Sequence, residues 1–198
     1  MDLGSLLLLS GLALTGGGVA LWRLRASRDE LTRRVFSQPI VKIGEVRNKS
    51  IVVVVGTVTH TEMIAAPLTH RPCAAFEYVE TSKESDVWHE RARRIAGVDF
   101  TVTDKSGEAL VHGTDVEMLL MKDKTVTFGN GHWERREGVI ANGDRIAVVG
   151  YASREPDPRP QTTGLGYRDR PTVLVIRSTR RGRARITNSP AVLDRAQH

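Results

Sequence analysis

The side chains that could do chemistry are few and widely spaced in this sequence. The one cysteine, Cys73, follows His70 and Arg71, whose charges could lower the pKa of its thiol and make it a nucleophile. A thiol that enters an apolar strand is more often a small buried side chain, and we expect this second role for Cys73. The sequence has no G-x-S-x-G, P-loop, H-E-x-x-H or C-x-x-C motif, and its histidines show no metal-ligand spacing. We therefore expect no catalytic residue, no metal site and no cofactor.

The aromatic residues bear on nucleic-acid binding, which in small β-barrels uses exposed rings above a positive groove. Phe76, Tyr78 and Phe100 occur at strand spacing and are better explained as core residues. Trp88 and Trp133 occur in loop-like contexts beside arginines. We expect these two tryptophans to be the better candidates for an exposed contact surface.

The positive charge is concentrated near the two ends of the chain. The net charge is +6, of which residues 23–34 carry +3 and residues 177–198 carry +5. Residues 35–176 have a net charge of −1. Because basic flanks also bind anionic lipid headgroups, the high pI does not indicate a nucleic-acid-binding domain, and we expect no nucleic-acid partner.

The N-terminal residues have the length and composition of a membrane span. No charge occurs from Leu3 to Trp22, and a helix of twenty residues crosses a hydrocarbon core of about 30 Å. We predict a transmembrane helix at residues 3–24; a cleavable signal peptide and a buried soluble helix are the alternatives. Arginines follow the span and none precedes it, so we expect a single-pass membrane protein with a cytoplasmic C-terminal domain.

We expect arginines near both ends of the chain to contact anionic lipid headgroups. A solvated tail is the alternative for those near the C-terminus. The expected lipid-contact residues are Arg23, Arg25, Arg28, Arg180, Arg181, Arg183 and Arg185.

Between the flanks, the sequence changes to short β-branched runs separated by glycine, proline and asparagine. We divide the chain into a juxtamembrane helix and linker (25–38), a β-domain (39–178) and a basic tail (179–198). Alternation or continuous apolar runs predict strands at 51–58, 74–80, 98–103, 108–112, within 141–152 after a turn at Asn142 and Gly143, and at 172–178. Residues 116–123 fit a short helix or a strand, and the longest predicted loops are 83–96 and 153–171. The predicted fold is mainly β, a small partly closed barrel or sandwich that is OB-like.

The stretch APLTHRPCAAFEYVE, residues 66–80, is followed by VWHE, VDFTVTDKSGEALV, GDRIAVVGYASREPDP and GYRDRPTVLVI. This ordered set, beside a membrane span, resembles the GIDE domain, also called the beside-a-membrane domain. That domain occurs in the mitochondrial ubiquitin ligase activator of NF-kappa-B and its bacterial relatives. The resemblance covers nearly all of residues 40–178.

The resemblance draws attention to one turn. Pro67 and Pro72 restrict the backbone, so the chain makes a stiff turn that delivers Cys73 into the following strand in one register. We hypothesise that Arg71 forms a polar cluster with Asp169 and Arg170; the alternative is a turn needed for folding only. The candidate partner-contact or motif residues are Pro67, Arg71, Pro72, Cys73, Trp88, Asp169 and Arg170.

The resemblance also implies a function, but this sequence lacks parts on which that function depends. In the eukaryotic relatives, ubiquitin transfer depends on a RING domain beyond a second membrane span, and this sequence has neither. We therefore expect a membrane-anchored module that binds a protein or small ligand close to the bilayer. The alternatives are a RING-type ubiquitin transferase by family relationship and OB-like nucleic-acid binding. The identity of the ligand and the oligomeric state stay open.

Overall fold

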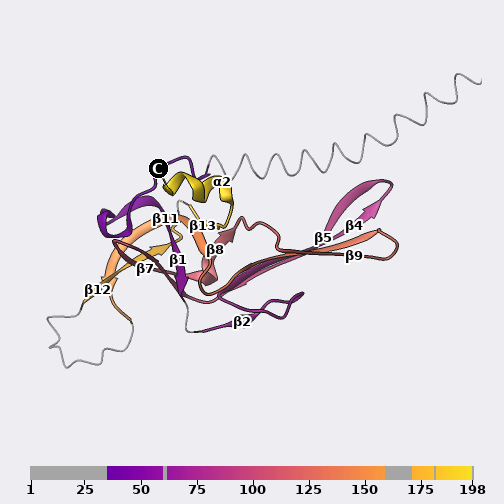
Figure 1. The fold of residues 1–198 in the computed structure, drawn as a ribbon, viewed down its shortest axis with the longest axis horizontal. Helices are drawn as coiled ribbons and strands as arrows, with labels where there is room; N and C mark the ends of the chain where they lie inside the picture. The colour runs from indigo at the N-terminus through magenta and orange to yellow at the C-terminus, as the bar shows by residue number, and fades with distance from the viewer. Residues whose placement is uncertain (1–34, 60–61, 159–170, 181, 198) are drawn as a thin grey trace, which may run out of the picture.

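A computed structural model describes residues 35–59, 62–158, 171–180 and 182–197 (Figure 1). The predicted transmembrane helix at 3–24 and most of the linker at 25–38 lie outside these residues. Among the residues described, no helix is long and apolar enough to cross a membrane.

The centre of the fold is a closed barrel of five strands. In order around the ring these are β1 (Ser50–Thr59), β6 (Phe100–Asp104), β7 (Gly107–Val111), β12 (Thr172–Arg177) and β11 (Arg145–Pro156). Pairing of β1 with β11 closes the ring, β7 and β12 are parallel, and the other neighbours are antiparallel. The predicted mainly β class is confirmed, and the barrel is closed rather than partly closed.

The apolar patterns of the sequence explain these strands. Val52 and Val54 of β1 belong to the cluster inside the barrel, whereas Val53 and Val55 pack in a second cluster with the C-terminal helix. The run is continuously apolar because both faces of β1 are covered. Gly56 permits a close approach of backbones, since a Cβ there would lie 2.6 Å from the carbonyl oxygen of Thr103.

Two further strands extend the barrel sheet beyond β11. They are β13 (Ala184–Thr187) and β8 (Val116–Met118), which pair in parallel. The segment predicted as a basic tail therefore contains a strand. It also contains the short helices α2 (Pro190–Leu193) and η4 (Asp194–Gln197), which Figure 1 shows beside β11. Its arginines obscured a short alternating pattern in which Ala184 and Ile186 are buried.

A second sheet extends away from the barrel (Figure 1). Its strands, in order, are β5 (Val87–Gly97), β4 (Ala75–Glu84), β10 (Trp133–Ile140) and β9 (Lys124–Phe128). The prediction of a loop at 83–96 was wrong, because these residues form the end of β4, a tight turn and β5. The loop contexts predicted for Trp88 and Trp133 were also wrong, since both lie in strands. Because β5 is an exposed edge strand, it lacks the apolar alternation by which strands are recognised.

The remaining elements are short. Strands β2 (Ile64–Ala65) and β3 (Pro72–Cys73) form a small ribbon. The 3-10 helices are η1 (Ile43–Glu45), which contacts β7, and η2 (Gly113–Asp115), which contacts β5.

Candidate functional site

An open groove lies on the outer face of the barrel along β6 and β7. It has a volume of about 770 Å³, which is in the range of ligand pockets. Thr59, the last residue of β1, and Pro158, two residues after the end of β11, also contribute to its lining. The lining residues are Thr59, Glu62, Val98, Asp99, Phe100, Thr101, Thr103, Glu108, Leu110, Thr114 and Pro158.

The strand register explains the chemistry of this groove. Thr59 lies opposite Thr101 and Thr101 opposite Leu110, and in the neighbouring row Thr103 lies opposite Glu108. These side chains point outward because the alternate residues of β6 and β7 fill the barrel. The described lining therefore combines hydroxyl groups and carboxylates with apolar side chains, and none of its residues is a lysine or an arginine. The apolar residues are Val98, Phe100, Leu110 and Pro158.

Asp99, one of the lining residues, is held in a fixed position. Its carboxylate accepts a hydrogen bond from the backbone N–H of Gly113 at 3.1 Å, and the Nδ1 atom of His112 lies 2.8 Å away. Gly113 has no room for a side chain, since a Cβ would lie 2.0 Å from the carbonyl oxygen of Val98. The backbone of η2 thus fixes the carboxylate at the groove wall.

The turn of residues 66–72 is organised by a buried carboxylate from a distant strand. Glu137 of β10 is fully buried and accepts hydrogen bonds from the N–H of Leu68 at 2.6 Å and of Thr69 at 3.2 Å. It also accepts one from the Thr69 hydroxyl at 2.5 Å. The turn closes on itself through the N–H of Ala66, which donates to the carbonyl oxygen of Arg71 at 3.0 Å. A buried charge with several donors is stabilised, so Glu137 fixes this turn on the sheet.

Cys73 lies beneath that turn and is fully buried, as expected. Its thiol donates to the carbonyl oxygen of Ile64 at 3.4 Å. Burial, and then the negative charge of Glu137, raise the pKa of the thiol to about 11, although the positive charge of Arg71 lowers it. A thiol with so high a pKa is a poor nucleophile at neutral pH.

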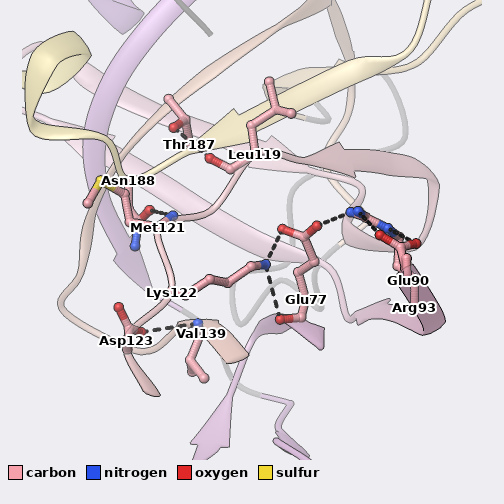
Figure 2. A network of polar contacts seen from close by, with 10 residues as sticks. All are labelled: Glu77, Glu90, Arg93, Leu119, Met121, Lys122, Asp123, Val139, Thr187 and Asn188. Carbon is pink, nitrogen blue, oxygen red and sulfur yellow. Dashed lines mark hydrogen bonds and ion pairs between the residues drawn. The ribbon is translucent and has the colours of Figure 1, made fainter. Parts of the chain in front are cut away.

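A seam of polar contacts joins the barrel to the projecting sheet (Figure 2). It is formed by residues 119–123, which follow β8. On the barrel side, the carbonyl oxygen of Leu119 accepts from the Thr187 hydroxyl at 2.8 Å, and the N–H of Met121 donates to Asn188 Oδ1 at 2.7 Å. Lys122 and Asp123, at the other end of the same segment, contact the projecting sheet.

On the sheet side, the central group of the seam is Glu77, whose side chain is fully buried. Figure 2 shows its carboxylate between two cations, Lys122 and Arg93. The distance from Lys122 Nζ to Glu77 Oε2 is 2.6 Å, and Arg93 also pairs with Glu90. Asp123 accepts a hydrogen bond from the N–H of Val139 at 3.2 Å. Burial raises the pKa of Asp123. The hydrogen bond from Val139 and the positive charge of Arg71 offset part of that rise.

The far end of the projecting sheet carries a group of aromatic side chains. The rings of Phe128 and Trp133 stack with centroids 6.1 Å apart, and the Arg135 guanidinium lies 4.5 Å from the centre of the Phe128 ring. Trp88 lies opposite Lys83 on the neighbouring hairpin. The N–H of Lys83 donates to the carbonyl oxygen of His132 at 2.7 Å, which joins the ends of the two hairpins.

The structure does not bring all predicted site residues together. Pro67, Arg71, Pro72 and Cys73 share one turn, while Trp88 lies near the far end of β5. Arg180 and Arg183 are exposed, but Arg185 forms an ion pair with Glu117 at 2.6 Å. The predicted residues that lie outside the described part of the chain are Asp169, Arg170, Arg23, Arg25, Arg28 and Arg181.

The buried carboxylates were missed as functional candidates. The available signal was a glutamate between apolar residues in FEYV, and a glutamate that directly precedes the apolar end of a strand in EGVI. The acidic lining of the groove was also missed, because Glu62, Asp99 and Glu108 are distant in sequence.

Comparisons with family models, with curated proteins and with solved structures find no match for this chain.

Proposed function

We propose that this chain is a membrane-anchored binding module whose barrel holds a basic, extended segment of a partner protein. The observation that carries the proposal is the open groove along β6 and β7, with its hydroxyl and carboxylate lining. The anchor at residues 3–24 and the GIDE resemblance are parts of the proposal.

The arrangement of the barrel supports a binding role at this face. The ring order β1-β6-β7-β12-β11, with β7 and β12 parallel, is similar to that of the OB barrel. OB barrels bind ligands on the face of their second and third strands and between two flanking loops. The corresponding strands here are β6 and β7, where the groove lies.

The charge of the groove favours a cationic ligand. Glu62, Asp99 and Glu108 would repel nucleic-acid phosphates, whose binding depends on lysine and arginine. The same carboxylates attract lysine and arginine side chains, and the threonine hydroxyls can bond to a peptide backbone. A basic peptide in an extended conformation satisfies both groups of side chains.

The test uses the full chain in lipid nanodiscs and measures fluorescence anisotropy of labelled decapeptides. We expect binding of a lysine- and serine-rich peptide, and no comparable binding of a glutamate-rich peptide or of a ten-nucleotide single-stranded DNA. Glu108→Arg should weaken peptide binding by about tenfold or more, because it reverses charge in the groove. Glu84→Arg, with the same charge change on the distant β4, is the matched control. Equal binding of all three probes, or no effect of Glu108→Arg, would contradict the proposal.

A further inference from the structure

Apolar residues gather at the far end of the projecting sheet, and none of them lines the groove. We define the hairpin tips as the turns at residues 85–86 and 129–132 together with Val87, Trp88, Phe128 and Trp133. Val87 is 49% exposed, and the three aromatic residues are half-buried. The tips therefore present apolar surface at the part of the sheet furthest from the barrel (Figure 1).

Apolar side chains lie on both faces of the sheet at this end. Trp133 lies opposite Phe128 and Ser82, so these side chains share one face. Trp88 lies opposite Lys83 and therefore points to the other face. A flat protein partner would cover one face, whereas a bilayer interface receives an end with apolar groups on all sides.

The charges behind the tips favour an anionic surface. Residues 80–94 and 124–136 contain seven lysines and arginines and five carboxylates, which gives a net charge of +2. Each of the five carboxylates forms an ion pair within the sheet: Glu80 with Arg135, Glu84 with Arg91, Asp86 with Lys83, Glu90 with Arg93 and Glu134 with Arg136. The negative charges are thus neutralised locally, and exposed Arg94 and Lys124 add positive charge.

From this arrangement we propose that the hairpin tips insert into the headgroup region of an anionic bilayer. Tryptophan prefers this region because its ring is apolar and its N–H can bond to water or headgroups. The flanking cations attract anionic lipid over about one Debye length. The tips thereby form a contact with the membrane that is separate from the predicted N-terminal anchor. This inference does not depend on a ligand in the groove.

The test places an environment-sensitive fluorophore on the full chain in vesicles, because flotation alone would also report the predicted anchor. In a Cys73→Ala background, NBD is attached at the substitution His132→Cys or, as matched control, at Lys105→Cys in the exposed β6–β7 turn. With vesicles of phosphatidylcholine and phosphatidylserine, we expect at least about a twofold higher NBD emission at position 132 and quenching by brominated lipid. Position 105 should show neither effect.

A variant of the exposed side chain completes the design. Val87→Asp should abolish most of the emission gain at position 132 without unfolding the protein, since Val87 is outside the core. The proposal is overturned if positions 132 and 105 respond alike. It is also overturned if pure phosphatidylcholine gives the full response, or if the response occurs in detergent and depends on protein concentration, which would indicate self-association.

Discussion

At the scale of single residues, Cys73 shows how one turn controls the chemistry of a side chain. The thiol is buried between the turn of residues 66–72 and the sheet, and its pKa is raised to about 11 from an ordinary value of 9.0. The thiolate fraction at pH 7 is then about 100-fold smaller than for an ordinary thiol. We expect native Cys73 to react with DTNB at least about 100-fold more slowly than the protein in guanidinium chloride. Native and denatured rates within threefold of each other would contradict this.

Asp104 gives a second test at the same scale, through pH. Burial raises the pKa of Asp104. Hydrogen bonds from the Ser106 hydroxyl and from the N–H groups of Ile43, Ser106 and Gly107 together lower the pKa by more than burial raises it, so the net shift is downward. The carboxylate therefore stabilises the fold above its unfolded pKa of about 3.9, and this stabilisation is lost as the pH falls through the folded pKa.

We expect Asp104→Ala to lower the free energy of unfolding by about 1–3 kcal/mol at pH 7, because the partly buried N–H groups of Ile43 and Gly107 lose their acceptor. The difference between the wild type and Asp104→Asn should shrink below about pH 4. Urea unfolding at a series of pH values measures both effects, with the exposed Asp115→Asn as control. A difference that is constant from pH 7 to pH 3 would rule out the proposed role of the charge.

At the scale of elements, the short helices α2 and η4 join the two ends of the described chain. Val192 and Phe36 are both fully buried in the cluster on the outer face of β1 and β11. The Arg195 guanidinium donates to the carbonyl oxygens of Phe36, Ser37 and Gln38. One residue thus holds the backbone that leads from the N-terminal segment onto the barrel.

Variants of these helices should separate packing from hydrogen bonding. Val192→Ala removes two methyl groups and should cost about 1.6 kcal/mol by area alone. Arg195→Lys keeps the charge but lacks the planar fork, so it should increase hydrogen exchange in residues 36–41, where the N–H of Val41 donates to Val53, nearly as much as Arg195→Met. Mass-spectrometric hydrogen exchange measures this, with exposed Arg183→Met as control. Full retention of protection in Arg195→Met would show that these hydrogen bonds are dispensable.

The elements also show what a sequence can reveal. The strands β1, β6, β7, β11 and β12 were predictable because their apolar residues alternate or run together between glycine and asparagine turns. Strand β5 was not, since an edge strand with exposed faces needs no apolar pattern. The contact between Glu137 and Leu68 joins residues 69 apart in sequence, and nothing local to either residue indicates it. The features that the sequence did not reveal are therefore an exposed edge strand and a polar contact between distant residues.

At the scale of the whole molecule, the seam of residues 119–123 contacts both the barrel and the projecting sheet. The barrel carries the groove, and the sheet carries the hairpin tips at its far end (Figure 1). Lys122 lies between the two, with its ammonium group against the buried carboxylate of Glu77. A stiff seam would let a partner in the groove and a lipid surface at the tips be held at a fixed separation.

Loss of Lys122 should loosen this connection. Lys122→Met leaves the buried Glu77 carboxylate paired with Arg93, so we expect a loss below the about 3–5 kcal/mol that a buried charge costs when it is left uncompensated. Adding Glu77→Gln should recover part of that loss, because the neutral amide is less costly to bury, and a double-mutant cycle gives the coupling energy. Hydrogen exchange should show that β4 and β10 lose protection before β1 and β11. Lys124→Met, on exposed β9, is the matched control and should change stability by no more than about 0.5 kcal/mol. If Lys122→Met behaves like that control, the sheet is held by packing alone, and the seam does not set its orientation.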